Sequence, residues 1–169
     1  SVYHTLVEVA GTYNESLKKY LNLRKEVLGL DAYHTYDRFL TLAKSDKKYS
    51  YEAAKELFFK SISWLPQDFR EKAEEVLRDG FVDVFESEGK RTGAYSSGMA
   101  NLHPFILLNH DETLDSAFTV AHEAGHSIHS MYAAEAQPTM LQDYTIFVAE
   151  IASTFNEHAL LDYFLSSED

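Results

Sequence analysis

The residues best suited to chemistry lie in one short segment, where His122, Glu123 and His126 form the pattern His-Glu-x-x-His. Residues four apart on an α-helix share one face, so the two imidazoles can bind one metal ion. Glu123 lies beside that face, where its carboxylate can take a proton from a water that the metal activates. The pattern predicts the zinc site and the general base of a peptidase. A chance match on a helix rich in His and Glu is the alternative.

A site of this kind needs a third protein ligand, because catalytic zinc usually has three and keeps one position for water. The chain has no cysteine, so this ligand must be a histidine or a carboxylate. His129 and Tyr132 stand where a metzincin would have glycine and histidine, which excludes that class. Glu150 is the predicted ligand. It lies 24 residues after His126, beyond the break expected at Pro138, in an apolar segment where an unpaired carboxylate would be costly.

Two further residues share the predicted metal face. Glu157 lies two helical turns beyond Glu150 and competes with it as third ligand. We expect Glu157 instead to accept the outer ring N–H of a metal-binding histidine. His129 lies three residues past His126, and we expect a satisfied helix histidine or an outer hydrogen-bond donor rather than a fourth ligand. The predicted site therefore holds one Zn²⁺ ion on His122, His126 and Glu150.

The composition favours some classes of protein and excludes others. The chain has 169 residues, 45% of them apolar, which favours one folded domain over residues 1–169. Its net charge of −12 makes nucleic acid and anionic membranes poor partners; a preference for cationic peptides is possible in principle, although acidic surfaces are common. The sequence contains neither a run of apolar residues long enough to span a bilayer nor a signal peptide. Without cysteine, disulfides are excluded, and a cytoplasmic location is expected.

Apolar residues at three- and four-residue steps predict a mainly α-helical fold. The expected helices are a long opening helix ending near Gly29, one from Ser50 to Pro66, one from Gln67 to Arg78, one from Thr113 to about Glu135, and one from Met140 to Leu165. Residues 31–43 are expected to be part helix and part irregular, and residues 44–49 a loop. Pro138 would let the last helix pack antiparallel to the helix that carries the histidines.

Two short segments between the helices are candidate strands. Gly93 and Gly98 bracket residues 94–97, and residues 105–108 follow Pro104. They predict a short β-ribbon that lies beside the metal-binding helix and lines a groove.

The same segments carry a family resemblance. The motifs are Gly93-Ala94-Tyr95-Ser96-Ser97-Gly98, His103-Pro104-Phe105-Ile106-Leu107-Leu108-Asn109, the stretch from Phe118 to Ser130, Gln137-Pro138, and the stretch from Phe147 to Thr154. In this order they resemble the M3 family of zinc oligopeptidases, and most closely its oligoendopeptidase F branch. The chain is thus expected to be the central part of a longer M3-type catalytic domain.

The resemblance implies roles for the residues. Zinc would be bound by His122, His126 and Glu150, with Glu123 as general base and later proton donor. Short peptides would be cleaved at internal bonds inside a deep channel. The edge formed by Ala94, Tyr95 and Ser96 would pair with an extended substrate through backbone hydrogen bonds.

Family enzymes are several times longer than this chain, and their Tyr and His donors to the tetrahedral oxyanion follow the segment matched here. The alternative is therefore a catalytically incomplete fragment that binds zinc but lacks these donors. A third possibility is another hydrolase with the same metal core, which would cleave esters or acylated amino acids.

Overall fold

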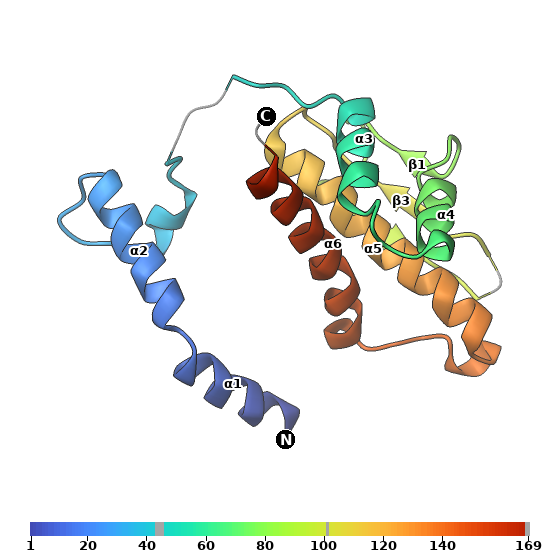
Figure 1. Cartoon of the computed structure of the whole chain (residues 1–169), viewed down its shortest axis with the longest axis horizontal. Helices are drawn as coiled ribbons and strands as arrows, with labels where there is room; N and C mark the ends of the chain where they lie inside the picture. The colour runs from blue at the N-terminus through green and yellow to red at the C-terminus, as the bar shows by residue number, and fades with distance from the viewer. Residues whose placement is uncertain (43–45, 101, 168–169) are drawn as a thin grey trace. The chain divides into compact units, whose positions relative to one another are not determined.

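The computed structural model describes residues 1–42, 46–100 and 102–167 (Figure 1). Contacts between residues divide the chain into two compact units, Ser1–Asp46 and Lys47–Asp169. The three predicted metal ligands belong to the second unit. The single domain predicted over residues 1–169 stays a prediction.

The first unit contains two short α-helices where the sequence predicted one long helix. That prediction was wrong, because α1 (Val2–Thr12) ends at its C-cap Tyr13 and α2 (Glu15–Val27) begins after its N-cap Asn14. Asparagine is among the residues that favour a helix N-cap. The predicted end near Gly29 is confirmed: Gly29 has a φ of +64°, and the backbone N–H of Leu30 donates to the carbonyl oxygen of Lys25 at 3.0 Å.

The buried side chain of Arg24 holds the rest of the first unit together. Its guanidinium donates to the hydroxyl of Tyr33 at 3.0 Å and to the carbonyl oxygens of Asp37 at 3.2 Å and Leu40 at 2.6 Å. Residues 35–39 form the 3-10 helix η1 (Thr35–Phe39), as the mixed pattern of that stretch indicated. Of the loop predicted over residues 44–49, residues 46–49 are in neither helix nor strand, and residues 44 and 45 lie outside the described residues.

The second unit opens with two helices that start where the sequence predicted. α3 (Tyr51–Ser61) begins after Ser50, whose side-chain oxygen accepts the backbone N–H of Ala53 at 3.2 Å. Pro66 directly precedes α4 (Gln67–Val76), which ends two residues before the predicted Arg78. Both helices bury apolar residues, including Phe58 and Val76 at 0% exposure.

A small sheet follows, in the strand order β1-β3-β2. The two predicted strands are present as β2 (Tyr95–Ser97) and β3 (Phe105–Leu107), and they pair antiparallel with Ser96 opposite Ile106. The two-residue strand β1 (Val82–Asp83) pairs parallel with β3 on the other side. Sequence analysis missed β1, since two residues are too few to show a period-two pattern.

The last two helices form the frame of the site. α5 (Leu114–Ala136) begins after Thr113, whose side chain accepts the backbone N–H of Ser116, close to the predicted bounds. α6 (Ile146–Ser166) begins six residues later than predicted, because Met140 lies in the 3-10 helix η2 (Thr139–Leu141). The loop before α6 is tied to the end of α5: the Gln142 amide donates to the carbonyl oxygens of Ala134 and Gln137.

α5 is the central element of the second unit and contacts α3, α4, α6 and the sheet, while α3 also contacts α6 (Figure 1). α5 and α6 run antiparallel, as predicted, and their backbones approach each other closely at Gly125. A Cβ atom there would lie 2.8 Å from the carbonyl oxygen of Ala152 and from the Cα atom of Ser153. A residue without a side chain therefore lets the two backbones meet between the two histidines.

Each helix of the described residues is too short or too polar to cross a bilayer. The mainly helical fold, with a short ribbon beside the helix that carries the two predicted histidine ligands, is as the sequence predicted.

Candidate metal centre

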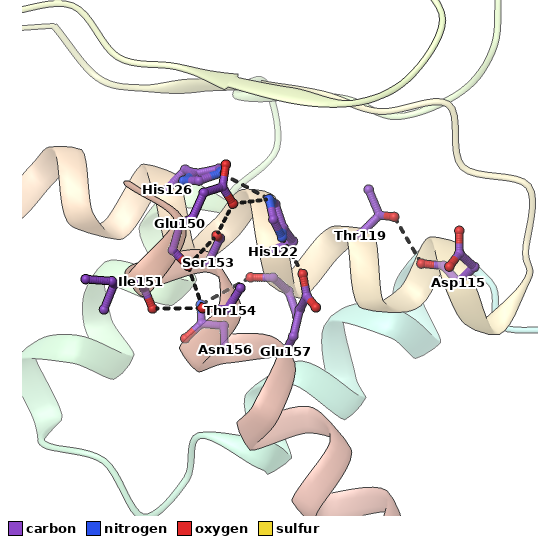
Figure 2. A network of polar contacts seen from close by, with 11 residues as sticks. Asp115, Thr119, His122, His126, Glu150, Ile151, Ser153, Thr154, Asn156 and Glu157 are labelled. Atoms are coloured by element: carbon purple, nitrogen blue, oxygen red, sulfur yellow. Dashed lines mark hydrogen bonds and ion pairs between the residues drawn. The ribbon is translucent and has the colours of Figure 1, made fainter. Parts of the chain in front are cut away.

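The three predicted ligands come together between α5 and α6. His122 and His126 lie one turn apart on α5, and Glu150 lies in the first turns of α6 (Figure 2). The Nε2 atoms of the two histidines are 3.1 Å apart. The Glu150 carboxylate oxygens lie 3.6 Å from Nε2 of His122 and 4.0 Å from Nε2 of His126. One ligand atom from each residue thus falls within 4.8 Å of the other two.

These distances fit a single tetrahedral ion. Zinc–nitrogen and zinc–oxygen bonds of about 2.0–2.2 Å at tetrahedral angles separate neighbouring ligand atoms by about 3.3–3.5 Å. The separations of 3.1, 3.6 and 4.0 Å bracket that value. The donors are two imidazoles and one carboxylate, a set known from catalytic zinc sites with an open fourth position. Among the described residues, this is the group of His, Asp and Glu side chains that converges closely enough to hold an ion.

Glu157 contacts the outer side of His122. One of its carboxylate oxygens makes a short hydrogen bond with Nδ1 of His122 (Figure 2). A proton on Nδ1 donated to this carboxylate leaves the lone pair of Nε2 free for a metal. Glu157 is therefore where an outer carboxylate is expected, and it is not one of the three converging ligands.

The environment of His126 favours its neutral form. Burial, followed by the charge of His122, lowers the pKa of His126, while Glu150 and a hydrogen bond with the Ala149 backbone act in the opposite direction. Metal binding requires a neutral imidazole, so a lowered pKa keeps this ligand available at neutral pH.

Glu123 lies next to the ligands with a largely buried side chain, 5% exposed. Burial raises the pKa of its carboxyl above the ordinary value, although His122 and the backbone N–H of Ser96 lower it. Its Oε2 atom has no hydrogen-bond partner among the described residues. A carboxyl with a raised pKa and an unused oxygen can accept and return a proton near neutral pH.

The His129 ring lies against Tyr144 and is not one of the side chains that converge with Glu150. Its ring stacks on Tyr144, with centroids 3.9 Å apart, and burial lowers its pKa. The Tyr144 hydroxyl bonds Ser130 Oγ at 2.7 Å and lies 3.5 Å from the carbonyl oxygen of His126. His129 therefore packs against Tyr144, three residues after His126 on α5.

The strand β2 lies along α5 beside the ligands. The hydroxyls of Ser96 and Ser127 are 2.8 Å apart, and a Cβ atom at Gly98 would lie 2.9 Å from Ser130 Oγ. Among the described strands, β2 pairs on one side only, with β3. The three predicted edge residues Ala94, Tyr95 and Ser96 are therefore in or next to an edge strand that runs in the same direction as α5.

Two cavities open at the two ends of this edge. One of about 730 Å³ lies beside His126 and is lined by Gly98, Met131 and Tyr144. The other, of about 310 Å³, lies beside His122 and Glu123 and is lined by Ala94 and the carboxylates of Asp115 and Glu157. The two cavities therefore leave space on both sides of the converging side chains along the edge of β2.

The profile of peptidase family M3 matches residues 1–168 of the chain. This chain belongs to peptidase family M3. The M3 chain is 42% identical to oligopeptidase PepF of Bacillus subtilis over 167 residues, which is 98% of this chain and 25% of that protein. It is 38% identical to group B oligopeptidase PepB of Streptococcus agalactiae, over 97% of this chain and 27% of that protein.

A solved structure is also similar in fold. The crystal structure of a peptidase from Chlamydophila abortus matches 99% of this M3 chain and 28% of its own length, with 38% identity and a TM-score of 0.82. The chain thus spans about a quarter of the length of the relatives that it matches.

Sequence analysis missed the polar contacts that α6 makes inside the M3 site. Asn156 and Ser153 are fully buried, and Asn156 donates from its amide to the carbonyl oxygen of Ala121 at 3.2 Å. Ser153 Oγ lies 3.0 Å from a Glu150 carboxylate oxygen. The three-residue spacing of Ser153 from Glu150 on the same helix was the available signal for that contact.

Proposed function

We propose that this chain carries the metal centre of a zinc-dependent endopeptidase that hydrolyses internal bonds of short oligopeptides. The observation that supports this most strongly is the convergence of His122, His126 and Glu150, with Glu123 one residue along α5. Membership of family M3 and relatives that are named oligopeptidases point the same way. The roles of the individual residues, the metal and the substrate class are parts of the proposal.

The metal would be held by Nε2 of His122, Nε2 of His126 and the carboxylate of Glu150. Bound zinc would activate a water molecule and polarise the carbonyl group of the scissile peptide bond. Glu157 would hold the ring of His122 in the required orientation and tautomer through Nδ1. Zinc is preferred to softer metals because the chain offers nitrogen and oxygen ligands and no thiolate.

Glu123 would move the proton. Its carboxylate accepts a proton from the attacking water, and the same carboxyl then gives that proton to the nitrogen of the leaving amine. The new bond joins the water oxygen to the carbonyl carbon, and the bond that breaks joins this carbon to the amide nitrogen. Burial, which raises the pKa of Glu123, suits a group that must work in both directions.

The peptide would lie along the open edge of β2, at Ala94, Tyr95 and Ser96. Pairing with a strand edge uses the peptide backbone and makes little demand on side chains. A peptide that pairs antiparallel to β2 would place residues before the scissile bond toward Gly98 and the larger cavity. Residues after that bond would then lie toward Ala94 and the smaller, acidic cavity.

A second candidate is a metal-binding piece with little turnover of its own. The observation in its favour is that the chain spans about a quarter of its relatives. Tyr144 lines the larger cavity, but its hydroxyl is bonded to Ser130 rather than directed toward the ligands. Loss of one oxyanion donor typically costs about a hundredfold to a thousandfold in rate.

One experiment tests both functions. Zinc is measured by elemental analysis, and cleavage of an internally quenched peptide is followed with and without a chelator, for the natural protein and for residues 1–169. The peptidase proposal predicts one zinc per natural protein and cleavage that the chelator stops. Zinc in residues 1–169 without chelator-sensitive cleavage by them would favour the second candidate for this chain, and cleavage without zinc would contradict both.

A further inference from the structure

Ser153 is a buried hydroxyl directed at the third predicted ligand. It lies one turn after Glu150 on α6 and is 0% exposed. Its Oγ atom is 3.0 Å from Oε2 of Glu150 and 3.1 Å from the carbonyl oxygen of the same residue (Figure 2). The hydroxyl has one proton and two acceptors. An ionised carboxylate is the stronger acceptor, so the proton favours Oε2.

The Glu150 side chain needs such a contact more than the histidines do. Its side chain is 44% exposed, compared with 25% for His122 and 17% for His126. A long exposed side chain loses rotamer freedom when it binds a metal, and that loss weakens binding. The oxygen that Ser153 contacts, Oε2, is also the one that lies 3.6 Å from Nε2 of His122.

Ser153 itself lies at a close backbone contact between the two helices. Its Cα atom lies where a Cβ atom of Gly125 would be only 2.8 Å away. Gly125 is on the turn of α5 between His122 and His126. The position of the hydroxyl is therefore set by the same backbone contact that sets the distance between the helix with two ligands and the helix with the third.

We propose that Ser153 is a positioning residue, which holds the Glu150 carboxylate toward the two histidines before a metal binds. This inference rests on the proposed metal centre. Ser153 does not touch the reacting atoms; it acts through Glu150. Its effect belongs to metal affinity, since a carboxylate that is already oriented loses less freedom on binding.

Thr154 provides a matched control on the next position. Its hydroxyl also donates to Glu150, at 2.5 Å, but to the backbone carbonyl oxygen and not to the carboxylate. Thr154 is exposed, and Ser153 is buried. Removing either hydroxyl deletes one hydrogen bond to Glu150, and only one of the two bonds can orient its carboxylate.

The experiment measures the zinc dissociation constant of the whole natural protein by competition with a chelating indicator. Ser153→Ala should weaken zinc binding by about 10-fold to 100-fold. Thr154→Ala should leave it unchanged. Melting curves of the metal-free variants, followed by circular dichroism, report the contribution of each hydroxyl to folding. An unchanged dissociation constant for Ser153→Ala, with or without a lower melting temperature, would overturn the inference, as would equal weakening by both variants.

His126→Ala separates this inference from the proposed function on which it rests. If His126→Ala abolishes zinc binding and Ser153→Ala does not weaken it, the metal centre stands and the role of Ser153 is wrong. If His126→Ala binds zinc as tightly as the natural protein, the centre itself is wrong.

Discussion

Glu123 carries an ionisable carboxyl group in a largely buried position, where a charge is destabilising. Burial raises the pKa of this carboxyl. One of its oxygens has no hydrogen-bond partner among the described residues. Buried polar groups without partners are destabilising, so their presence beside a candidate centre indicates a use in chemistry rather than in folding.

Glu123→Gln tests that use. The amide keeps the shape of the side chain but cannot accept and return a proton, so we expect peptide cleavage by the natural protein to fall by about 10²-fold to 10⁴-fold. Zinc content should not change, because Glu123 is not one of the three converging ligands. Steady-state kinetics and elemental analysis on the same samples measure both. Cleavage at the normal rate would remove Glu123 from the mechanism.

At the residue scale, the sequence predicted the side chains that a fixed spacing connects. The four-residue step from His122 to His126 places both rings on one helix face, and this step holds in any α-helix. Glu150 could be inferred from ligand number and from its apolar neighbours. The three-residue spacing of Ser153 from Glu150 places the two side chains near each other but does not fix their hydrogen bond, since the rotamer of a buried serine depends on which helix packs against it.

At the scale of elements, the site depends on how closely α5 and α6 approach. One close contact is at Gly125, against the backbone of Ala152 and Ser153. Even a methyl group at this position would have to push backbone atoms apart. The distance from Glu150 to the two histidines would then increase with the distance between the helices.

Gly125→Ala should therefore destabilise the protein by about 1–3 kcal/mol through overpacking, even though alanine favours a helix more than glycine does. Gly11→Ala is the control: Gly11 is also helical, in α1, with open space where its Cβ atom would be. That variant should be neutral or up to about 1 kcal/mol more stable. Urea denaturation measures both. Equal effects of the two substitutions would show that the α5–α6 contact is not tight.

The contact between α4 and α5 gives a pH-dependent prediction. The Tyr132 hydroxyl donates to the Asp68 carboxylate at 2.7 Å, and this bond is the main cause that lowers the pKa of Asp68 below 3.8. The folded state then holds this proton less tightly than the unfolded state. The stabilisation is complete above pH 3.8 and is lost as the pH falls through the lowered pKa.

Burial, together with Asp68, raises the pKa of Tyr132 from 10.0 to about 12. Between these values the unfolded chain loses the phenol proton first, so stability falls as the pH rises. Tyr132→Phe should lower the melting temperature at pH 7, and this difference should be lost at strongly acid pH and as the pH rises from 10.0 to about 12. A difference that stays constant from acid to alkaline pH would mean that the Asp68–Tyr132 bond does not contribute.

Helix starts that local residues determine were predicted correctly, and elements that depend on contacts with distant parts of the chain were not. Ser50, Pro66 and Thr113 fixed three helix starts, because caps and proline act locally. The start of α6 depends on contacts of Gln142 with the end of α5, which no local pattern shows. The strand β1 exists only because β3 lies beside it.

At the scale of the whole molecule, the contacts divide the chain at residues 46 and 47, and every residue of the candidate centre lies after that division. Residues 47–169 should therefore bind zinc with a dissociation constant within about twofold of that of residues 1–169. Competition with a chelating indicator on both proteins measures this. Loss of binding in the shorter protein would show that the first unit is needed for the centre, and would favour the single domain that the sequence predicted.

The central claim is that His122, His126 and Glu150 hold one metal ion. Crystals of the natural protein grown with zinc, with diffraction data collected on both sides of the zinc absorption edge, test it most directly. We expect one anomalous peak between Nε2 of His122, Nε2 of His126 and the Glu150 carboxylate, at about 2.0–2.2 Å from each ligand atom. A peak held by other residues, or no peak at this position, would contradict it.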